Sequence, residues 1–194
     1  MRRSADLLAA MAGDDDAMDA VAEEWLPQVY AWCHRLGGPR VDAEDAAHEV
    51  LIVMCRRIQR VRTEAQFPAW LFGIARRVVA NHRRRAWVRR WVPGASLERV
   101  EDRRWSPLRT VDAAQTADAV WATLDALPAV QREVLILIDL EERSGPEVAE
   151  LVGIPVGTVK SRLRVARRAF RAQLREEMGD EWVAAFEGSS AEVG

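Results

Sequence analysis

Residues 144–170 read SGPEVAELVGIPVGTVKSRLRVARRAF, and this stretch decides the fold of the second half of the chain. Ser144 and Glu147 have the S-x-x-E spacing of a capping box, in which the two residues satisfy each other's backbone N–H groups at a helix start. Pro146 falls in the first helical turn, where its missing N–H breaks no hydrogen bond. The pattern predicts a short helix that runs to about Val152.

A second, longer helix follows a sharp turn. Gly153 permits the turn because glycine adopts backbone conformations that other residues avoid, and Pro155 is expected in the first turn of the new helix. A short helix, a glycine turn and a longer helix make the helix-turn-helix layout. Apolar residues of the second helix share one face that we expect to pack inward: Val159, Leu163, Ala166 and Phe170.

The opposite face of this helix is polar and basic. Arginine and lysine attract phosphate and donate to guanine edges, while serine and threonine reach bases or phosphate. Every charged residue from Thr158 to Arg175 is basic, although the whole chain has a net charge of -2. This pattern favours DNA binding over a merely solvated face. The candidate DNA-binding residues are Thr158, Lys160, Ser161, Arg162, Arg164 and Arg168, and further along the helix Arg167, Arg168 and Arg171 are expected mainly to meet phosphate.

Composition and periodicity predict a soluble, all-α protein. The 194 residues are 49 % hydrophobic and 30 % charged, which is ordinary for globular proteins, and apolar residues recur at helical spacing. The apolar run 134–138 is too short to span a bilayer, and no signal peptide opens the chain. Cys33 and Cys55 are expected to be reduced thiols. A zinc site that adds His34 and His48 is a disfavoured alternative, because the spacing is not that of a zinc finger.

The chain divides into two small helical domains. The first has two apolar stripes at helical spacing, one of Ala47, Leu51, Met54 and Ile58 and one of Phe67, Leu71, Ile74 and Val78. An opening helix is expected over about 17–36, and after a Gly-Gly-Pro loop the next starts near Asp42. Periodicity fails over 91–111, which predicts a flexible linker. The expected domains are therefore 12–90 and 112–176, followed by an acidic, frayed tail at 177–194.

Two further polar faces lie in the first domain. Opposite the core stripe of the helix after residue 42 is a mixed stripe of Asp45, His48, Glu49, Ile52 and Arg56. Such a face suits a protein interface, with a solvated surface as the alternative. Every charged residue from Arg76 to Arg90 is arginine, and the strip of Arg77, Asn81 and Arg84 lies opposite the second apolar stripe. A basic strip that contains an amide suits phosphate binding and the reading of an unstacked base.

These stretches carry a family resemblance. LPAVQREVLILIDLEERSGPEVAELVGIPVGTVKSRLRVARR (127–168) resembles region 4 of the sigma-70 family, in its extracytoplasmic-function group. DAEDAAHEVLIVMCRRI (42–58) and AQFPAWLFGIARRVVANHRRR (65–85) are similar to region 2 of the same group. The resemblance implies that region 4 binds the minus-thirty-five promoter element. It also implies that residues 42–58 dock on the polymerase clamp and that 65–85 bind the minus-ten element.

The resemblance also assigns a base-capture loop. In the family, the segment that corresponds to RVRTEAQ (60–66) receives a base flipped out of the duplex, and a pocket must offset the cost of unstacking it. The implied minus-ten residues are Arg60, Arg62, Arg76, Arg77, Asn81 and Arg84. Among the positions that depart from the family pattern, Arg77 replaces a common asparagine and Val165 replaces a common arginine. Among the tryptophans, Trp70 is expected in the core, and Trp87 and Trp91 are candidates for contact with DNA or polymerase.

The implied function is that of a sigma factor without catalytic residues, metal or cofactor. Its implied partners are core RNA polymerase, at the clamp and flap regions, promoter DNA, and an anti-sigma factor of a kind often anchored in the membrane. The implied location is the bacterial cytoplasm, at the nucleoid. The alternative is a free-standing helix-turn-helix regulator, which would bind promoter DNA tightly without polymerase. An enzyme is disfavoured because the histidines His34, His48 and His82 accompany no recognisable nucleophile and no phosphate-binding loop occurs.

Overall fold

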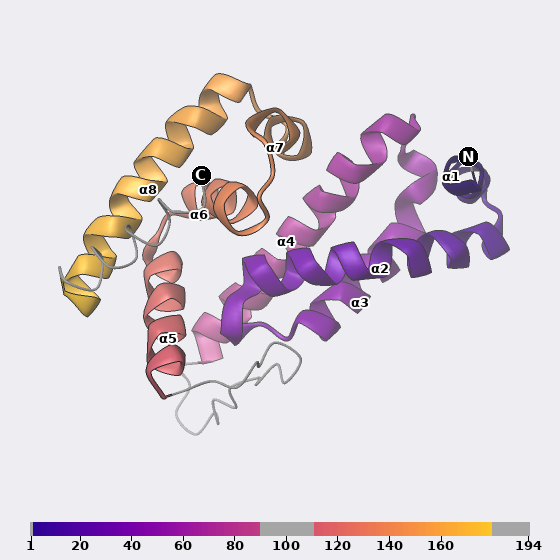
Figure 1. The fold of residues 1–194 in the computed structure, drawn as a ribbon. Helices are drawn as coiled ribbons and strands as arrows, with labels where there is room; N and C mark the ends of the chain where they lie inside the picture. Colours follow the sequence, from indigo (N-terminus) through magenta and orange to yellow (C-terminus); the bar gives the residue numbers. More distant parts are fainter. Residues whose placement is uncertain (1, 90–110, 180–194) are drawn as a thin grey trace. The chain divides into compact units, whose positions relative to one another are not determined.

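The computed structural model describes residues 2–89 and 111–179, which belong to two compact units (Figure 1). Residues 2–89 belong to one unit, and residues 111–149 and 154–179 belong to the other. The described residues form helices and no strands, so the all-α prediction is confirmed. The predicted linker lies outside the described residues except for its last position, and so does most of the predicted tail.

The first unit is a bundle of three longer helices with a shorter one at its end. The long helices are α2 (Asp15–Gly37), α3 (Ala43–Arg57) and α4 (Phe67–Arg89), and each contacts the other two. The 3-10 turns η1 (Gly38–Arg40), η2 (Ile58–Arg60) and η3 (Glu64–Gln66) connect them. As predicted, α3 begins directly after Asp42: the Asp42 Oδ1 atom accepts hydrogen bonds from the backbone N–H groups of Glu44 and Asp45, each 3.0 Å long.

Aromatic rings occupy the centre of this bundle. Trp32 of α2 and Phe72 of α4 are almost fully buried and meet edge to face, with ring centroids 5.1 Å apart. Trp25 meets the buried Phe67 in the same way at 5.2 Å. Edge-to-face contacts align the positive ring edge with the negative face of the partner ring. The two predicted apolar stripes face this core and are buried, apart from the half-buried Leu51.

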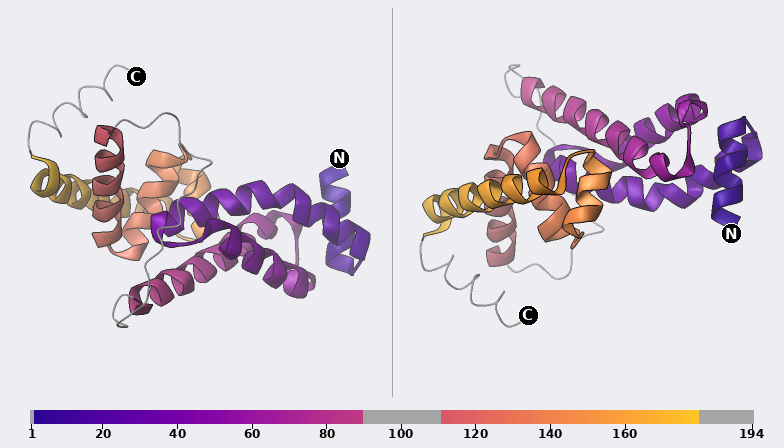
Figure 2. Two further views of the ribbon diagram at one scale, coloured as in Figure 1. Left: turned by 90° about the horizontal axis from the view of Figure 1, so that it is seen from below. Right: turned by 90° about the horizontal axis from the view of Figure 1, so that it is seen from above.

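A helix that the sequence analysis did not predict precedes the bundle. Helix α1 (Arg2–Ala12) contacts α2 and the turns η2 and η3 (Figures 1 and 2). Ala10 is fully buried and Leu7 nearly so. Gly13 has φ +99° and joins α1 to α2, whose N-cap Asp14 accepts a 2.9 Å hydrogen bond from the backbone N–H of Ala17. The first unit therefore begins before residue 12.

Two glycines of the first unit give a matched test of its packing. A Cβ atom on the buried Gly37 would lie 2.7 Å from the Cβ of Val41, whereas a Cβ on Gly73, inside α4, would meet no atom within 4 Å. We expect Gly37→Ala to lower the free energy of unfolding by about 1–3 kcal/mol through overpacking. Gly73→Ala should raise it by about 0.5–1 kcal/mol through helix propensity. Urea titration of the full chain measures both values, and shifts of the same sign would contradict this packing.

The second unit contains the helix-turn-helix. Its elements are α5 (Val111–Ala126), α6 (Ala129–Leu135), the π-helical turn η5 (Ile136–Leu140), α7 (Gly145–Val152) and α8 (Val156–Met178). Helix α8 contacts both α5 and α6. The core between these helices is aliphatic, and its buried residues include Leu124, Val134, Ile136, Leu137, Val148, Val159, Ala166 and Leu174.

The predicted cap and turn are confirmed. The backbone N–H of Ser144 donates to Glu147 Oε2 at 2.8 Å, and the Glu147 N–H donates to the Ser144 hydroxyl at 3.4 Å. Hydrogen bonds from Ser144 hold the pKa of Glu147 below its ordinary value. Gly153 has φ +74°, in the left-handed region that favours glycine. Pro155 lies one residue earlier than expected: it is the N-cap that precedes α8.

Candidate nucleic-acid interface

Helix α8 has the two faces that its sequence predicts. Val159 and Ala166 are buried, and Leu163 and Phe170 are half-buried. On the polar face Lys160, Ser161, Arg164 and Arg168 are exposed, and Thr158 and Arg162 are half-buried. All six candidate residues lie on α8: five are in its first three turns, where recognition helices meet base edges, and Arg168 is near its middle. The Ser161 hydroxyl donates to the Thr158 carbonyl at 3.0 Å, so in this rotamer its lone pairs remain available as acceptors.

Arg167, for which the sequence predicts a phosphate contact, is ion-paired with Asp139 in this structure. Its Nε donates to Asp139 Oδ2 at 3.0 Å, and its Nη2 donates to Asp139 Oδ1 at 2.5 Å. This bidentate pair raises the pKa of the guanidinium. Asp139 lies in the π-helical turn η5, so the pair ties the middle of α8 to the turn that follows α6. The Arg167 side chain itself stays exposed, with 46 % of its accessible surface retained.

The predicted mixed stripe of α3 is exposed for most of its length. Asp45, His48, Ile52 and Arg56 are exposed, and the side chain of Ile52 keeps 51 % of its accessible surface. A single exposed aliphatic side chain is ordinary on a protein surface, so it is the position of Ile52 within a polar stripe that favours an interface. The stripe thus has the composition of an interface with an apolar centre and a polar rim.

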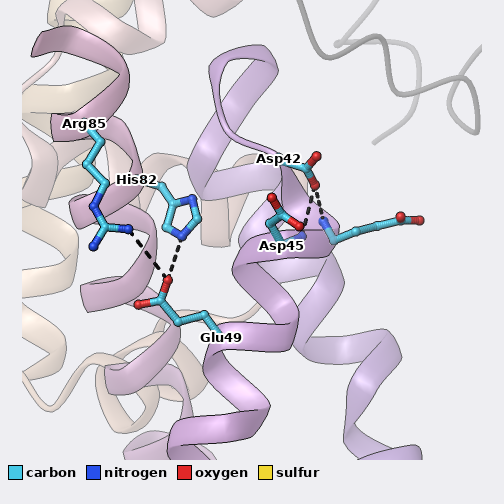
Figure 3. A network of polar contacts seen from close by, with 6 residues as sticks. Asp42, Asp45, Glu49, His82 and Arg85 are labelled. Atoms are coloured by element: carbon cyan, nitrogen blue, oxygen red, sulfur yellow. Dashed lines mark hydrogen bonds and ion pairs between the residues drawn. The ribbon is translucent and has the colours of Figure 1, made fainter. Parts of the chain in front are cut away.

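Glu49 is the exception within this stripe, because it turns toward α4 (Figure 3). Its Oε2 atom lies 2.9 Å from Nε2 of His82 and 4.0 Å from Nη1 of Arg85. The side chains of Glu49 and His82 keep 40 % and 18 % of their accessible surface. Glu49 shares the predicted face of α3 with Asp45, four residues earlier, and its side chain also links α3 to α4.

The basic strip of α4 lies where its periodicity predicts. Arg76, Arg77 and Arg84 are exposed and Asn81 is half-buried. Arg83, which directly precedes Arg84, is half-buried and donates from Nη1 to the carbonyl of Gly37 at 3.1 Å.

Arg60 and Arg62 are exposed on the segment between α3 and α4, in which the side chain of Val61 is buried. The structure therefore brings all six minus-ten candidates onto α4 and the loop that precedes it.

The tryptophans considered in the sequence analysis differ in solvent exposure. Trp70 is half-buried, with its ring centroid 5.8 Å from that of Phe67, as expected for a residue at the edge of the core. Trp87, near the end of α4, keeps 59 % of its accessible surface, which suits a contact residue. Trp91 lies outside the described residues.

The two cysteines differ in environment. Cys33 is buried in α2, and burial raises the pKa of its thiol to about 12. Cys55 is exposed on α3, and the pKa of its thiol is also raised, by partial burial and by Asp19. Residues 2–89 and 111–179 hold no group of three or more metal-ligating side chains that could bind an ion, so the zinc alternative gains no support. No helix in this part of the chain is long and apolar enough to cross a membrane.

Two family models match separate parts of the chain. Residues 21–89 match the family described as Sigma-70 region 2, and residues 117–170 match Sigma-70, region 4. The "ECF RNA polymerase sigma factor SigD" of Mycobacterium bovis is 33 % identical over 178 residues, which cover 87 % of this chain and 80 % of the relative. The chain belongs to the extracytoplasmic-function group of the sigma-70 family. It is therefore a sigma factor, and sigma factors are a family of proteins that are not enzymes.

Two further relatives support this assignment of the sigma factor. The "ECF RNA polymerase sigma factor SigW" of Bacillus subtilis is 28 % identical over 172 residues, 84 % of this chain and 92 % of the relative. Among solved structures, the sigma factor RpoE from Bartonella quintana, in complex with the anti-sigma factor NepR, superposes with a TM-score of 0.56 at 27 % identity. That match covers 79 % of this chain and 95 % of the other.

Proposed function

We propose that this sigma factor docks on core RNA polymerase with α3, opens and reads the minus-ten element with α4 and the loop before it, and reads the minus-thirty-five element with α8. The observation that carries the proposal is the presence of two separate helical units that each present a basic helix face. Two separate basic faces suit a promoter with two separate elements, because each unit can then bind one element.

The docking surface is the exposed part of the α3 stripe, which we call the α3 face: Asp45, His48, Ile52 and Arg56. Its charges would set orientation and association rate, and Ile52 would supply apolar contact at the centre. Asp42 supports the face indirectly, because its cap fixes where the helix begins.

For the minus-ten element, the proposal assigns phosphate contacts to Arg77 and Arg84 and base reading to Asn81. Arginines that track a single strand provide salt-dependent affinity, while an amide side chain can discriminate base edges. Arg60 and Arg62 flank the buried Val61, so they can hold the backbone of a flipped nucleotide next to a firmly packed loop.

A third partner is an anti-sigma factor. The support is the RpoE structure, which was solved with the anti-sigma factor NepR. A sigma factor with two basic faces needs those faces covered when its promoters are silent, because exposed arginines attract nucleic acid non-specifically. The proposed place of action is the cytoplasm, where RNA polymerase works, and no catalytic step is assigned to the chain.

Run-off transcription with purified components tests the proposed function. We expect specific transcripts from a subset of genomic promoter fragments when the protein is combined with bacterial core polymerase. Without polymerase we expect only weak, salt-sensitive DNA binding, roughly in the range of non-specific complexes. Tight, sequence-specific binding by the isolated protein, with no transcripts on addition of polymerase, would instead support a free-standing regulator.

A further inference from the structure

Glu49 joins two surfaces to which the proposed function gives different tasks. It belongs to α3, which carries the docking face, but its Oε2 lies 2.9 Å from His82 Nε2 on α4 (Figure 3). Arg85, one turn further along α4, brings its Nη1 to 4.0 Å from the same oxygen. A hydrogen bond to an ionised carboxylate is stronger than one between neutral groups, and partial shielding from water strengthens it further.

The turn of α4 that contains His82 is held on a second side as well. Arg83 donates from Nη1 to the carbonyl of Gly37, at the end of α2, at 3.1 Å. The side chains of residues 82 and 83 thus tie one helical turn to both neighbouring helices. Asn81 and Arg84, the proposed minus-ten residues, flank these two tied residues in the sequence. Any rotation or slide of α4 that moved Asn81 and Arg84 would have to break a polar contact.

We propose that Glu49 is a positioning residue for promoter reading: through His82 it fixes the orientation of the α4 turn that presents Asn81 and Arg84. This inference rests on the proposed function. It assigns to Glu49 a role distinct from that of Asp45 and Ile52, which face away from the bundle. One carboxylate oxygen of Glu49, Oε2, is the acceptor for His82.

A double-mutant cycle in the reconstituted holoenzyme tests the role. The variants are Glu49→Ala, His82→Ala and the pair, and each is assayed on a preferred promoter and on one with an altered minus-ten element. The measured ratio is the amount of open complex on the preferred promoter divided by that on the altered promoter. We expect each single variant to reduce this ratio by about three- to tenfold. The double variant should be no worse than either single variant, and the Kd for core polymerase should change by less than about twofold.

The conservative variant Glu49→Gln provides the rescue, because its amide oxygen can still accept from His82 Nε2–H. It should keep the promoter ratio of the natural protein. All variants are compared at a temperature at which circular dichroism shows them fully helical. A merely structural role would lower the yield on both promoters alike and leave the ratio unchanged, which would overturn the inference.

Two other outcomes would also overturn it. One is additive loss of the ratio in the double variant, since independent residues do not share one effect. The other is weaker polymerase binding by Glu49→Ala in both the His82 and the His82→Ala backgrounds, which would make Glu49 a direct polymerase contact. That result would leave the proposed function intact. Whether the α3 face binds polymerase is tested separately, by measuring polymerase binding of variants at Asp45 and Ile52.

Discussion

Replacing Asp45 by arginine and Ile52 by glutamate should abolish binding of this sigma factor to core RNA polymerase. Both side chains are exposed on α3 and lie seven residues apart, two helical turns along one face. The first change reverses a charge at the rim, and the second puts a carboxylate where an aliphatic side chain would be buried. A central interface residue contributes about 2–4 kcal/mol, and the reversed rim charge also slows association, so the two changes together should weaken binding about a hundredfold.

The matched control is Glu23→Arg, which reverses an exposed charge on α2 of the same unit. Because the α3 face does not include this residue, co-purification with polymerase and the Kd should be unchanged. Neither variant should alter the helical circular dichroism spectrum, since none of the three side chains is buried. Retention of polymerase binding by the Asp45 and Ile52 double variant would show that α3 is not the docking helix.

Local chemistry made much of this fold predictable. Ser144, Glu147 and Gly153 act over three or four neighbouring residues, so their roles in the cap and turn follow from spacing alone. The inward faces of α4 and α8 could be predicted equally well, because a helix with a period of 3.6 residues places its apolar side chains on one side. For the same reason the opposite faces, with the candidate contact residues, could be identified before the structure was known.

Polar contacts between helices could not be predicted in this way. Glu49 and His82 are 33 residues apart, and Asp139 and Arg167 are 28 apart. Which charged residue of an exposed stripe turns to a partner depends on how two helices are placed against each other. Helix α1 was missed for a related reason: its deeply buried residues, Leu7 and Ala10, become informative only when α2 is present to cover them.

The last prediction concerns the helix that begins at Val156. Arg164 and Arg168 are both exposed on α8, one turn apart, and each loses the same side chain on replacement by alanine. Arg164 is nearer the helix start, where recognition helices reach base edges, and we expect Arg168, further along, to contact phosphate. Arg164→Ala should therefore relax preference at one or two positions of the minus-thirty-five element, by about 1–3 kcal/mol of discrimination.

Arg168→Ala serves as the matched variant. It should weaken all sequences alike and reduce the slope of log affinity against log salt concentration by about one. Competition of holoenzyme across a randomised upstream element, repeated at several salt concentrations, separates the two effects. The assay needs no knowledge of the natural promoters, because discrimination appears as enrichment among random sequences. If Arg164→Ala lowered affinity for every sequence equally, Arg164 would be a phosphate contact, and base reading would have to come from Lys160, Ser161 or Arg162.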